Sequence, residues 1–177
     1  AMVVETGAEA KVKVLSLIEK GVSVMSATST TANQIGLAEA IENSKDFVSL
    51  RKKITELPES EQRSAARRIN SAPDYVVGSA NAVTEDGQVV IASNSGSQLA
   101  PYAFSAAHVI WVVGTQKIVA NLDEAMERLE KHTLKLESAR LNKIYGIDST
   151  IRKLLIINSE VIPSRINVIL VKQMLRF

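Results

Sequence analysis

Cysteine is absent from the 177 residues of the chain, and histidine occurs only twice. The lack of cysteine excludes disulfides, thiolate nucleophiles, zinc–thiolate sites and cysteine-ligated iron–sulfur clusters within this chain. His108 opens an apolar stretch and His132 lies among lysines and glutamates, and neither has a second ligand nearby at metal-binding spacing. We therefore predict no metal site and no iron–sulfur cluster in this chain, and we interpret His108 as structural. The composition also fits a reducing cytoplasm, which is the predicted location.

Aromatic residues and long apolar runs are also scarce. Aromatics make up 4% of the sequence against 46% hydrophobic residues in all, so the core must be aliphatic. The formal net charge is +2, and the basic residues are scattered rather than gathered into a stripe with aromatics between them. Nucleic acid is therefore not an expected partner. The longest apolar run, Val109 to Val113, is far too short to cross a bilayer, so no membrane partner is expected either.

The length of the chain suits one domain over residues 1–177. Ala1 and Met2 resemble a vector remnant, and we expect an N-terminal segment to be missing. Short apolar stretches alternate with helical ones, which predicts a mainly parallel sheet covered on both faces. The predicted strands are 22–27, 75–78, 89–92, 108–113, 154–157 and 168–171, and the predicted helical stretches are 8–19, 35–41, two within 46–70, 99–107 and 122–141.

Three polar loops follow predicted strands, at 28–31, 79–85 and 93–97. In open parallel sheets ligands bind beyond the carboxyl ends of the strands. We therefore expect these loops to converge at one end of the sheet and to form a pocket, and we include Asn81 of the second loop among its ligand-binding residues.

The first and third loops each allow two interpretations. Thr28, Ser29 and Thr30 can cradle an anion at a helix N-terminus, or they can be an ordinary helix cap. In the third loop Gly96 permits close backbone approach to a phosphate or carboxylate, while Asn94 and Gln98 supply amide partners. The alternative is a solvated loop before the next helix.

Two charged residues are candidates for chemistry or binding. Glu85 can act as a nucleophile or base, but Glu85-Asp86-Gly87 between two apolar stretches is also a typical tight turn with Gly87 at positive φ. Lys117 follows the strand at 108–113 and can pair with an anionic ligand over that edge, or it can be an exposed surface lysine.

Four segments of the chain resemble the lactate-utilisation (LUD) domain family, in which G-A-N, E-T-G and G-x-x-K-I-V segments recur in this order. The resemblance runs from about residue 21 to the C-terminus. The family's E-T-G is Glu85-Asp86-Gly87 here, its E-G-N is Ser95-Gly96-Ser97, and its final L-G-F is Leu175-Arg176-Phe177. The segments are GSANAVTEDGQVV, SNSGSQLAP, HVIWVVGTQKIV and SRINVILVKQMLRF.

This resemblance implies a three-layer, Rossmann-like α/β domain, because the family is grouped with ribose-5-phosphate isomerase, glucosamine-6-phosphate deaminase and the CoA transferases. It further implies a protein of lactate or organic-acid utilisation that binds a small anionic or phosphate-bearing ligand, with no cofactor identified. Family members work with iron–sulfur partners in oxidising L-lactate to pyruvate, so iron–sulfur partner subunits or a homo-oligomer are expected.

Two further functions stay open on the same resemblance. One is an acyl or CoA transferase or an isomerase that uses Glu85, since CoA transferases form a thioester on a glutamate before a glycine-containing turn. The isomerases carry a catalytic aspartate in a G-A-D segment, and the matching position here is Asn81, which cannot be a general base. The other is a noncatalytic subunit of an iron–sulfur complex that oxidises lactate.

Overall fold

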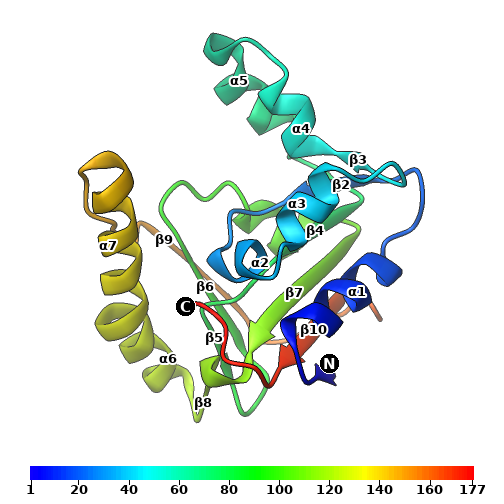
Figure 1. Cartoon of the computed structure of the whole chain (residues 1–177). Coiled ribbons are helices and arrows are strands. Elements are labelled where there is room, and N and C mark those ends of the chain that lie inside the picture. The colour runs from blue at the N-terminus through cyan, green and yellow to red at the C-terminus, as the bar shows by residue number, and fades with distance from the viewer.

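The computed structural model describes residues 1–177 and contains two β-sheets (Figure 1). The larger sheet has six strands in the order β1-β10-β7-β4-β2-β3, and every neighbouring pair is parallel. The prediction of a mainly parallel sheet is therefore confirmed. In chain order its strands are β1 (Met2–Val4), β2 (Ser23–Ser26), β3 (Val48–Ser49), β4 (Tyr75–Gly78), β7 (His108–Gly114) and β10 (Ile166–Val171).

The central strands of this sheet are apolar because both of its faces are covered. In β7 every residue after His108 is buried, and the strand consists largely of β-branched residues. This is the continuous apolar pattern that a parallel strand shows when neither face meets water. His108 stacks on Tyr75 of the adjacent strand with ring centroids 4.6 Å apart, in keeping with its interpretation as structural. Met2, which resembled a vector remnant, begins the edge strand β1.

Three helices cover one face of the six-stranded sheet. They are α1 (Gly7–Leu17), α2 (Thr30–Gln34) and α3 (Leu37–Glu42). Val14, Leu37 and Ile41 from these helices meet Ile110 and Ile169 of the sheet in a core of 14 buried residues. This packing explains why apolar residues recur at helical spacing in these segments, because each helix buries its apolar face on the strands.

A second, four-stranded sheet lies on the other face, in the order β8-β5-β6-β9. Val89 and Ile91 of β6 pack with Val76 and Trp111 of the larger sheet. The predicted strands 89–92 and 154–157 are present, but they pair antiparallel with each other in this second sheet. The strands are β5 (Ala82–Thr84), β6 (Val89–Ser93), β8 (Ile118–Val119) and β9 (Lys153–Ile157).

The outer side of the second sheet carries its own helical cover. Ala82 and Val90 pack against Ala125 of α6 (Leu122–Arg128) and Leu129 of the π-helical turn η3 (Leu129–Thr133).

The α/β, Rossmann-like class is confirmed. The prediction was that helices cover both faces of the main sheet, but the second face is covered by the four-stranded sheet and its helices together. The reason is the turn after β5, which is too short for a crossover helix and so returns β6 antiparallel.

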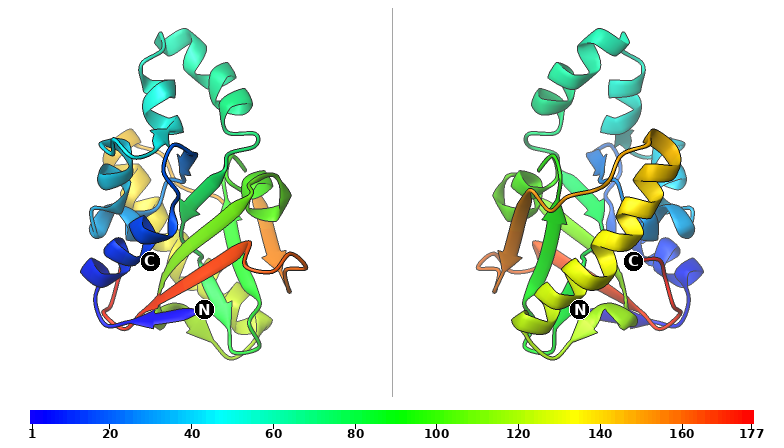
Figure 2. Two further views of the ribbon diagram at one scale, coloured as in Figure 1. Left: turned by 90° about the vertical axis from the view of Figure 1, so that its right-hand side faces the viewer. Right: turned by 90° about the vertical axis from the view of Figure 1, so that its left-hand side faces the viewer.

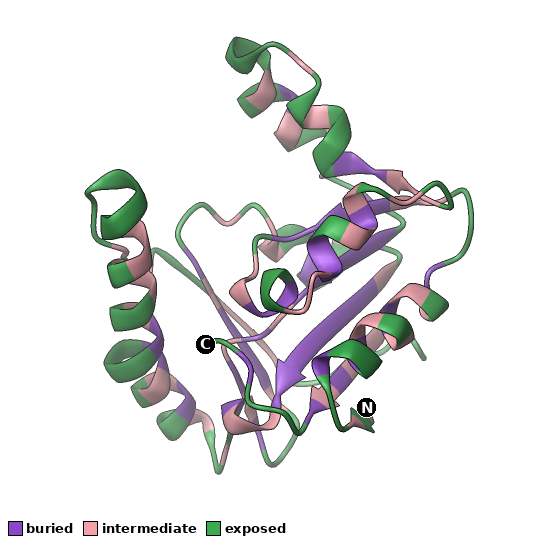
Figure 3. Ribbon diagram, in the orientation of Figure 1, coloured by how far each residue is buried: buried purple, intermediate pink, exposed green.

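Three helices extend from this body. The pair α4 (Leu50–Thr55) and α5 (Glu59–Ile69) projects beyond the sheets in both views of Figure 2. Helix α7 (Leu134–Tyr145) continues from η3 and has no buried residue, as the pink and green ribbon of Figure 3 shows. No helix of the structure has the length and apolar character needed to span a membrane.

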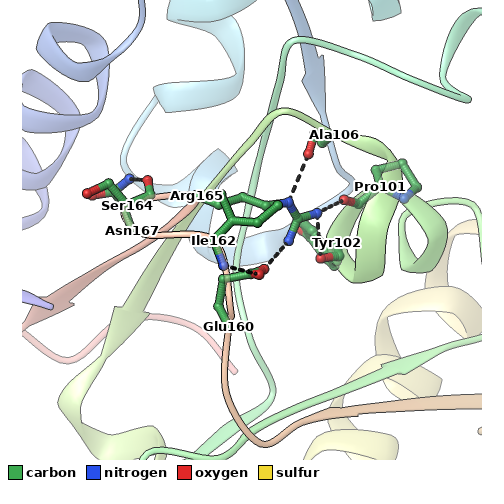
Figure 4. Close-up of polar contacts among 8 residues, drawn as sticks. All are labelled: Pro101, Tyr102, Ala106, Glu160, Ile162, Ser164, Arg165 and Asn167. Atoms are coloured by element: carbon green, nitrogen blue, oxygen red, sulfur yellow. Dashed lines mark hydrogen bonds and ion pairs between the residues drawn. The ribbon is translucent and has the colours of Figure 1, made fainter.

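A buried arginine fixes the π-helical turn η1 (Pro101–Ser105) to the loop before β10 (Figure 4). The Arg165 guanidinium donates to the carbonyl oxygens of Pro101 at 3.1 Å, Tyr102 at 3.2 Å and Ala106 at 3.0 Å. It also pairs with Glu160 at 2.6 Å. The Pro101 carbonyl also accepts the N–H of Ala106 within the turn, so the guanidinium adds a second donor there and supplies donors to the Tyr102 and Ala106 carbonyls. These bonds hold the turn from which the Tyr102 ring enters the core.

Candidate functional site

A cavity of about 350 Å³ lies beyond the carboxyl ends of strands β2, β4 and β6. The polar loops that follow these strands all contribute to its wall, but only the first two follow strands of the parallel sheet, because β6 belongs to the second sheet. The remaining wall includes Tyr102, Lys117, parts of η3 and α7, residues 149–151 and Phe177; Figure 1 shows the C-terminus between α7 and the main sheet. Of the predicted site residues, those that line the cavity are Thr28, Ser29, Thr30, Asn81, Asn94, Gln98 and Lys117.

Lys117 lies in the wall of this cavity and is only 1% exposed to solvent. It ends the short turn η2 (Thr115–Lys117) that directly follows β7. Its ammonium group donates to Thr31 Oγ1 at 3.0 Å, Ser79 Oγ at 3.1 Å and the Ala80 carbonyl at 3.1 Å. No carboxylate pairs with it.

Burial shifts the acid–base equilibrium of this amine. Desolvation, with a smaller contribution from the positive charge of Arg128, lowers the pKa of Lys117 to about 7. The three partners are neutral oxygen atoms, which compensate a positive charge less well than a carboxylate does. The charged form therefore lacks a counter-ion within the protein.

The hydroxyls of the first loop are mostly engaged by the protein itself. Ser29 Oγ accepts the Ala32 N–H at 3.1 Å, so Ser29 is the N-cap of α2 and the ordinary capping interpretation holds for it. Thr30 Oγ1 donates to the main-chain oxygen of Phe177 at 3.1 Å. Thr28 is exposed and makes no side-chain hydrogen bond, which leaves its hydroxyl free to contact a ligand.

Two amide side chains of the cavity wall are held in one orientation. Asn81 Oδ1 accepts the Ala92 N–H at 2.8 Å, and Gln98 Oε1 accepts the Ser93 hydroxyl at 3.1 Å. Each oxygen is thereby engaged, and each NH₂ group is left without a protein partner. Asn94 is exposed and makes no side-chain hydrogen bond. The NH₂ groups of Asn81 and Gln98 are therefore available as hydrogen-bond donors.

Two predicted site residues do not line the cavity. Gly96 adopts φ +84°, and a Cβ at this position would lie 2.6 Å from Lys153 Cδ, so its role is to turn the chain beneath that lysine. Glu85 is exposed in the turn between β5 and β6, where its N–H donates to the Val119 carbonyl. Gly87 has φ +89° as the tight-turn interpretation requires. The structure gives no support to the catalytic prediction for Glu85, because the turn carries it away from the cavity.

Sequence reasoning missed an ion pair in α7. Arg140 donates to both carboxylate oxygens of Glu137, at 2.8 Å and 2.6 Å, and both residues line the cavity. A Glu and an Arg three positions apart in a helix are typical of a solvated surface pair. No local signal in the sequence indicates that α7 crosses a cavity, because its position depends on the π-turn η3 and on the distant strands.

Sequence reasoning also missed Tyr102, whose ring is buried beside the cavity. Its hydroxyl lies where the Cβ of a side chain at position 78 would be. Burial raises the pKa of Tyr102, so this phenol stays protonated at neutral pH. A glycine is therefore needed at the end of β4, because the Cβ of any other residue would overlap Tyr102.

Several hydrogen-bond donors lie in the wall of the assembled cavity. Its charged and amide donors include Lys117, Asn81, Gln98 and Arg140, and its acidic side chain, Glu137, is paired with Arg140. A carboxylate or phosphate accepts hydrogen bonds from such donors. His, Cys, Asp and Glu side chains do not form any group of three or more that could hold a metal ion.

Comparison with known proteins gives one family match and several structural similarities. The model of the LUD domain matches residues 1–171. No curated protein sequence matches the chain. A DUF162 family protein from Deinococcus radiodurans is 14% identical, with 93% of this chain and 94% of that chain covered and a TM-score of 0.40.

Two further solved structures are similar over part of their length. One is eIF2B beta from Chaetomium thermophilum, at 18% identity and TM-score 0.43, where the match covers 67% of this chain and 41% of that chain. The other is ribose 5 phosphate isomerase A from Neisseria gonorrhoeae, at 14% identity and TM-score 0.40, with coverage of 78% and 65%. The present chain thus spans less than half of the matched eIF2B beta chain.

Proposed function

The chain belongs to the LUD domain family, and on that premise we propose that it acts in the utilisation of lactate or a related organic acid, binding a small carboxylate or phosphate-bearing anion in the cavity. The observation that carries this proposal is Lys117, a buried cation in the cavity wall whose partners are all neutral. An anion in the cavity supplies the missing counter-charge.

The physical argument is one of desolvation. Removing an ammonium group from water disfavours the charged form unless nearby negative charge or good hydrogen bonds compensate. The hydroxyls of Thr31 and Ser79 compensate in part. A bound anion stabilises the ammonium further, so binding and protonation of Lys117 favour each other.

The rest of the wall fits the same class of ligand. The free NH₂ groups of Asn81 and Gln98 and the guanidinium of Arg140 can share the oxygens of one carboxylate or phosphate. The volume of about 350 Å³ lies at the lower end of the range for small-molecule sites, which favours a small acid over a large cofactor.

Thermal unfolding with a ligand panel tests the proposal. The panel comprises lactate, pyruvate, sulfate, phosphate, a sugar phosphate and CoA, each with the wild type, Lys117→Met and Lys153→Met. Lys153 is the matched control, because it is exposed, does not itself line the cavity and donates only to the Ser95 carbonyl. A ligand at about 100 times its Kd stabilises the folded state by roughly 2.7 kcal/mol.

We expect a melting shift with at least one anion in the wild type and in Lys153→Met, and its loss in Lys117→Met. Because the anion binds best beside the ammonium form, the shift with sulfate or lactate should be larger at pH 6 than at pH 8.5. Equal shifts in all three proteins, or no shift with any anion, would refute anion binding in this cavity.

A second role follows from the composition rather than from the cavity. The chain has no cysteine, so an iron–sulfur cluster does not fit it. If lactate oxidation in this family passes electrons to such a cluster, this chain serves as the acid-binding subunit and the cluster lies in a partner chain. Affinity purification from the native host tests this role, with co-purified iron as the readout; iron-free purification of a functional complex would contradict it.

A further inference from the structure

We propose that Lys117 Nζ forms an imine with the carbonyl carbon of a small anionic aldehyde or ketone bound in the cavity. This inference rests on the proposed function and deepens it, since it assigns the anion a carbonyl group and the lysine a covalent role. The starting observation is that the amine lies in a cavity wall while being almost fully shielded from bulk solvent.

The hydrogen bonds around the amine leave its lone pair available. Thr31 Oγ1 donates its proton to the Arg176 carbonyl at 2.9 Å, and Ser79 Oγ donates to the Ala80 carbonyl at 3.2 Å. Both hydroxyls therefore face Lys117 as acceptors, like the Ala80 carbonyl itself. A neutral amine has two N–H groups for these three acceptors, and none of the three donates to its lone pair. In the neutral amine the lone pair takes the position of the third N–H, and no hydrogen bond occupies it.

Burial leaves part of this amine neutral at physiological pH. Desolvation, together with the charge of Arg128, lowers the pKa of Lys117 to about 7, so a large fraction is unprotonated at pH 7 to 8. Desolvated lysines next to cationic groups are the kind that enzymes use as imine-forming nucleophiles. An exposed lysine is almost entirely protonated at that pH.

The reaction needs no further reagent. The nitrogen adds to the carbonyl carbon to give a carbinolamine, and the carbonyl oxygen then leaves as water with the two hydrogens of the amine, so that a C=N bond replaces C=O. Oxidation states are unchanged. The amide donors of Asn81 and Gln98 can hold the anionic group of the same molecule, which makes a bifunctional carbonyl anion the preferred partner over a neutral aldehyde.

Borohydride trapping tests this directly. Borohydride reduces an imine to a stable secondary amine, and peptide mass mapping then locates the modified lysine. The wild type is treated with pyruvate, glyoxylate or dihydroxyacetone phosphate, and acetaldehyde serves as the neutral comparison. At pH 8 the neutral fraction of Lys117 exceeds that of an ordinary lysine on the order of a hundredfold, so we expect at least about tenfold more adduct at Lys117 than at Lys153.

Two variants and one unfolded sample complete the experiment. Lys117→Arg should remove the adduct and Lys153→Arg should retain it. Urea-unfolded wild type should lose the preference for Lys117, so mapping remains decisive even where the arginine variant folds poorly. Adduct spread evenly over the exposed lysines, or no adduct at Lys117, would overturn the proposal.

Anions that bind but cannot form an imine distinguish this inference from the proposed function. Lactate has no carbonyl group that can form an imine, so a lactate or sulfate melting shift tests the anion site alone. If these anions stabilise the wild type and no carbonyl compound modifies Lys117, anion binding stands and the imine fails. If no anion binds, the proposed function fails first.

Discussion

Replacing Lys117 with methionine should remove a specific pH dependence of the stability. Methionine keeps the length of the buried chain but has no group that titrates. In the wild type the folded-state pKa of Lys117 is about 7, whereas the ordinary value is 10.5. Between these two values the unfolded chain binds one more proton than the folded chain, so the free energy of unfolding rises with pH.

The size of the effect follows from the two values. Well above the folded-state pKa the slope approaches about 1.4 kcal/mol per pH unit, and near pH 7 it is about half of that. From pH 7 to pH 9 the wild type should gain about 2 kcal/mol relative to the variant. For a chain of this length this equals roughly 4 to 8 °C in melting temperature.

Urea unfolding of both proteins at pH 6, 7, 8 and 9 measures this gain. Other lysines and tyrosines titrate in both proteins, so the difference between the two curves isolates Lys117. Arg128 is the charged neighbour that contributes to the shift, while Glu137 and Arg140 in the cavity wall neutralise each other. Parallel stability curves for wild type and Lys117→Met across pH 7 to 9 would refute the reasoning.

Three substitutions test other parts of the structure. Gly78→Ala should destabilise by about 1 to 3 kcal/mol in urea unfolding, because its Cβ would overlap the buried Tyr102 hydroxyl. Arg165→Met should cost about 3 to 5 kcal/mol in the same assay, since it removes the cation paired with Glu160 and the side-chain donor of the Tyr102 and Ala106 carbonyls. Glu85→Gln should change stability by less than about 0.5 kcal/mol and leave any lactate melting shift intact; a lost shift would reinstate Glu85 as a site residue.

Strands of the main sheet can be predicted from the sequence because their burial is continuous. Tyr75 to Gly78 is predicted at the observed bounds of β4, and the long apolar stretch from His108 agrees with β7 to within one residue. Each signal is local, because a strand covered on both faces shows only apolar residues. The convergence of the loops after β2 and β4 follows from parallel pairing alone, since parallel strands end at the same edge.

The second sheet could not be predicted, for the opposite reason. Two of its strands, β5 and β8, have three and two residues, which is too short for a period-two pattern to emerge from the sequence. The partners of β6 depend on the turn at Glu85 to Gly87, which sends the chain back on itself. The strands predicted at 89–92 and 154–157 agree with β6 and β9 to within one residue, but they belong to this second sheet and not to the mainly parallel sheet that was predicted. Pairing is a property of distant segments rather than of local composition.

The role of Lys117 shows the same limit within the site. The sequence shows that Lys117 follows the end of the strand at 108–113, and this position correctly predicts that the lysine lies at the carboxyl edge of the sheet. Its chemistry is not visible there, because the hydroxyls that contact its amine come from positions 86 and 38 residues earlier in the chain. A lysine with the same neighbours in sequence but without those contacts and the burial that accompanies them would be fully protonated at neutral pH. The acid–base state of this amine, and with it the kind of ligand that the cavity accepts, is therefore set by tertiary structure.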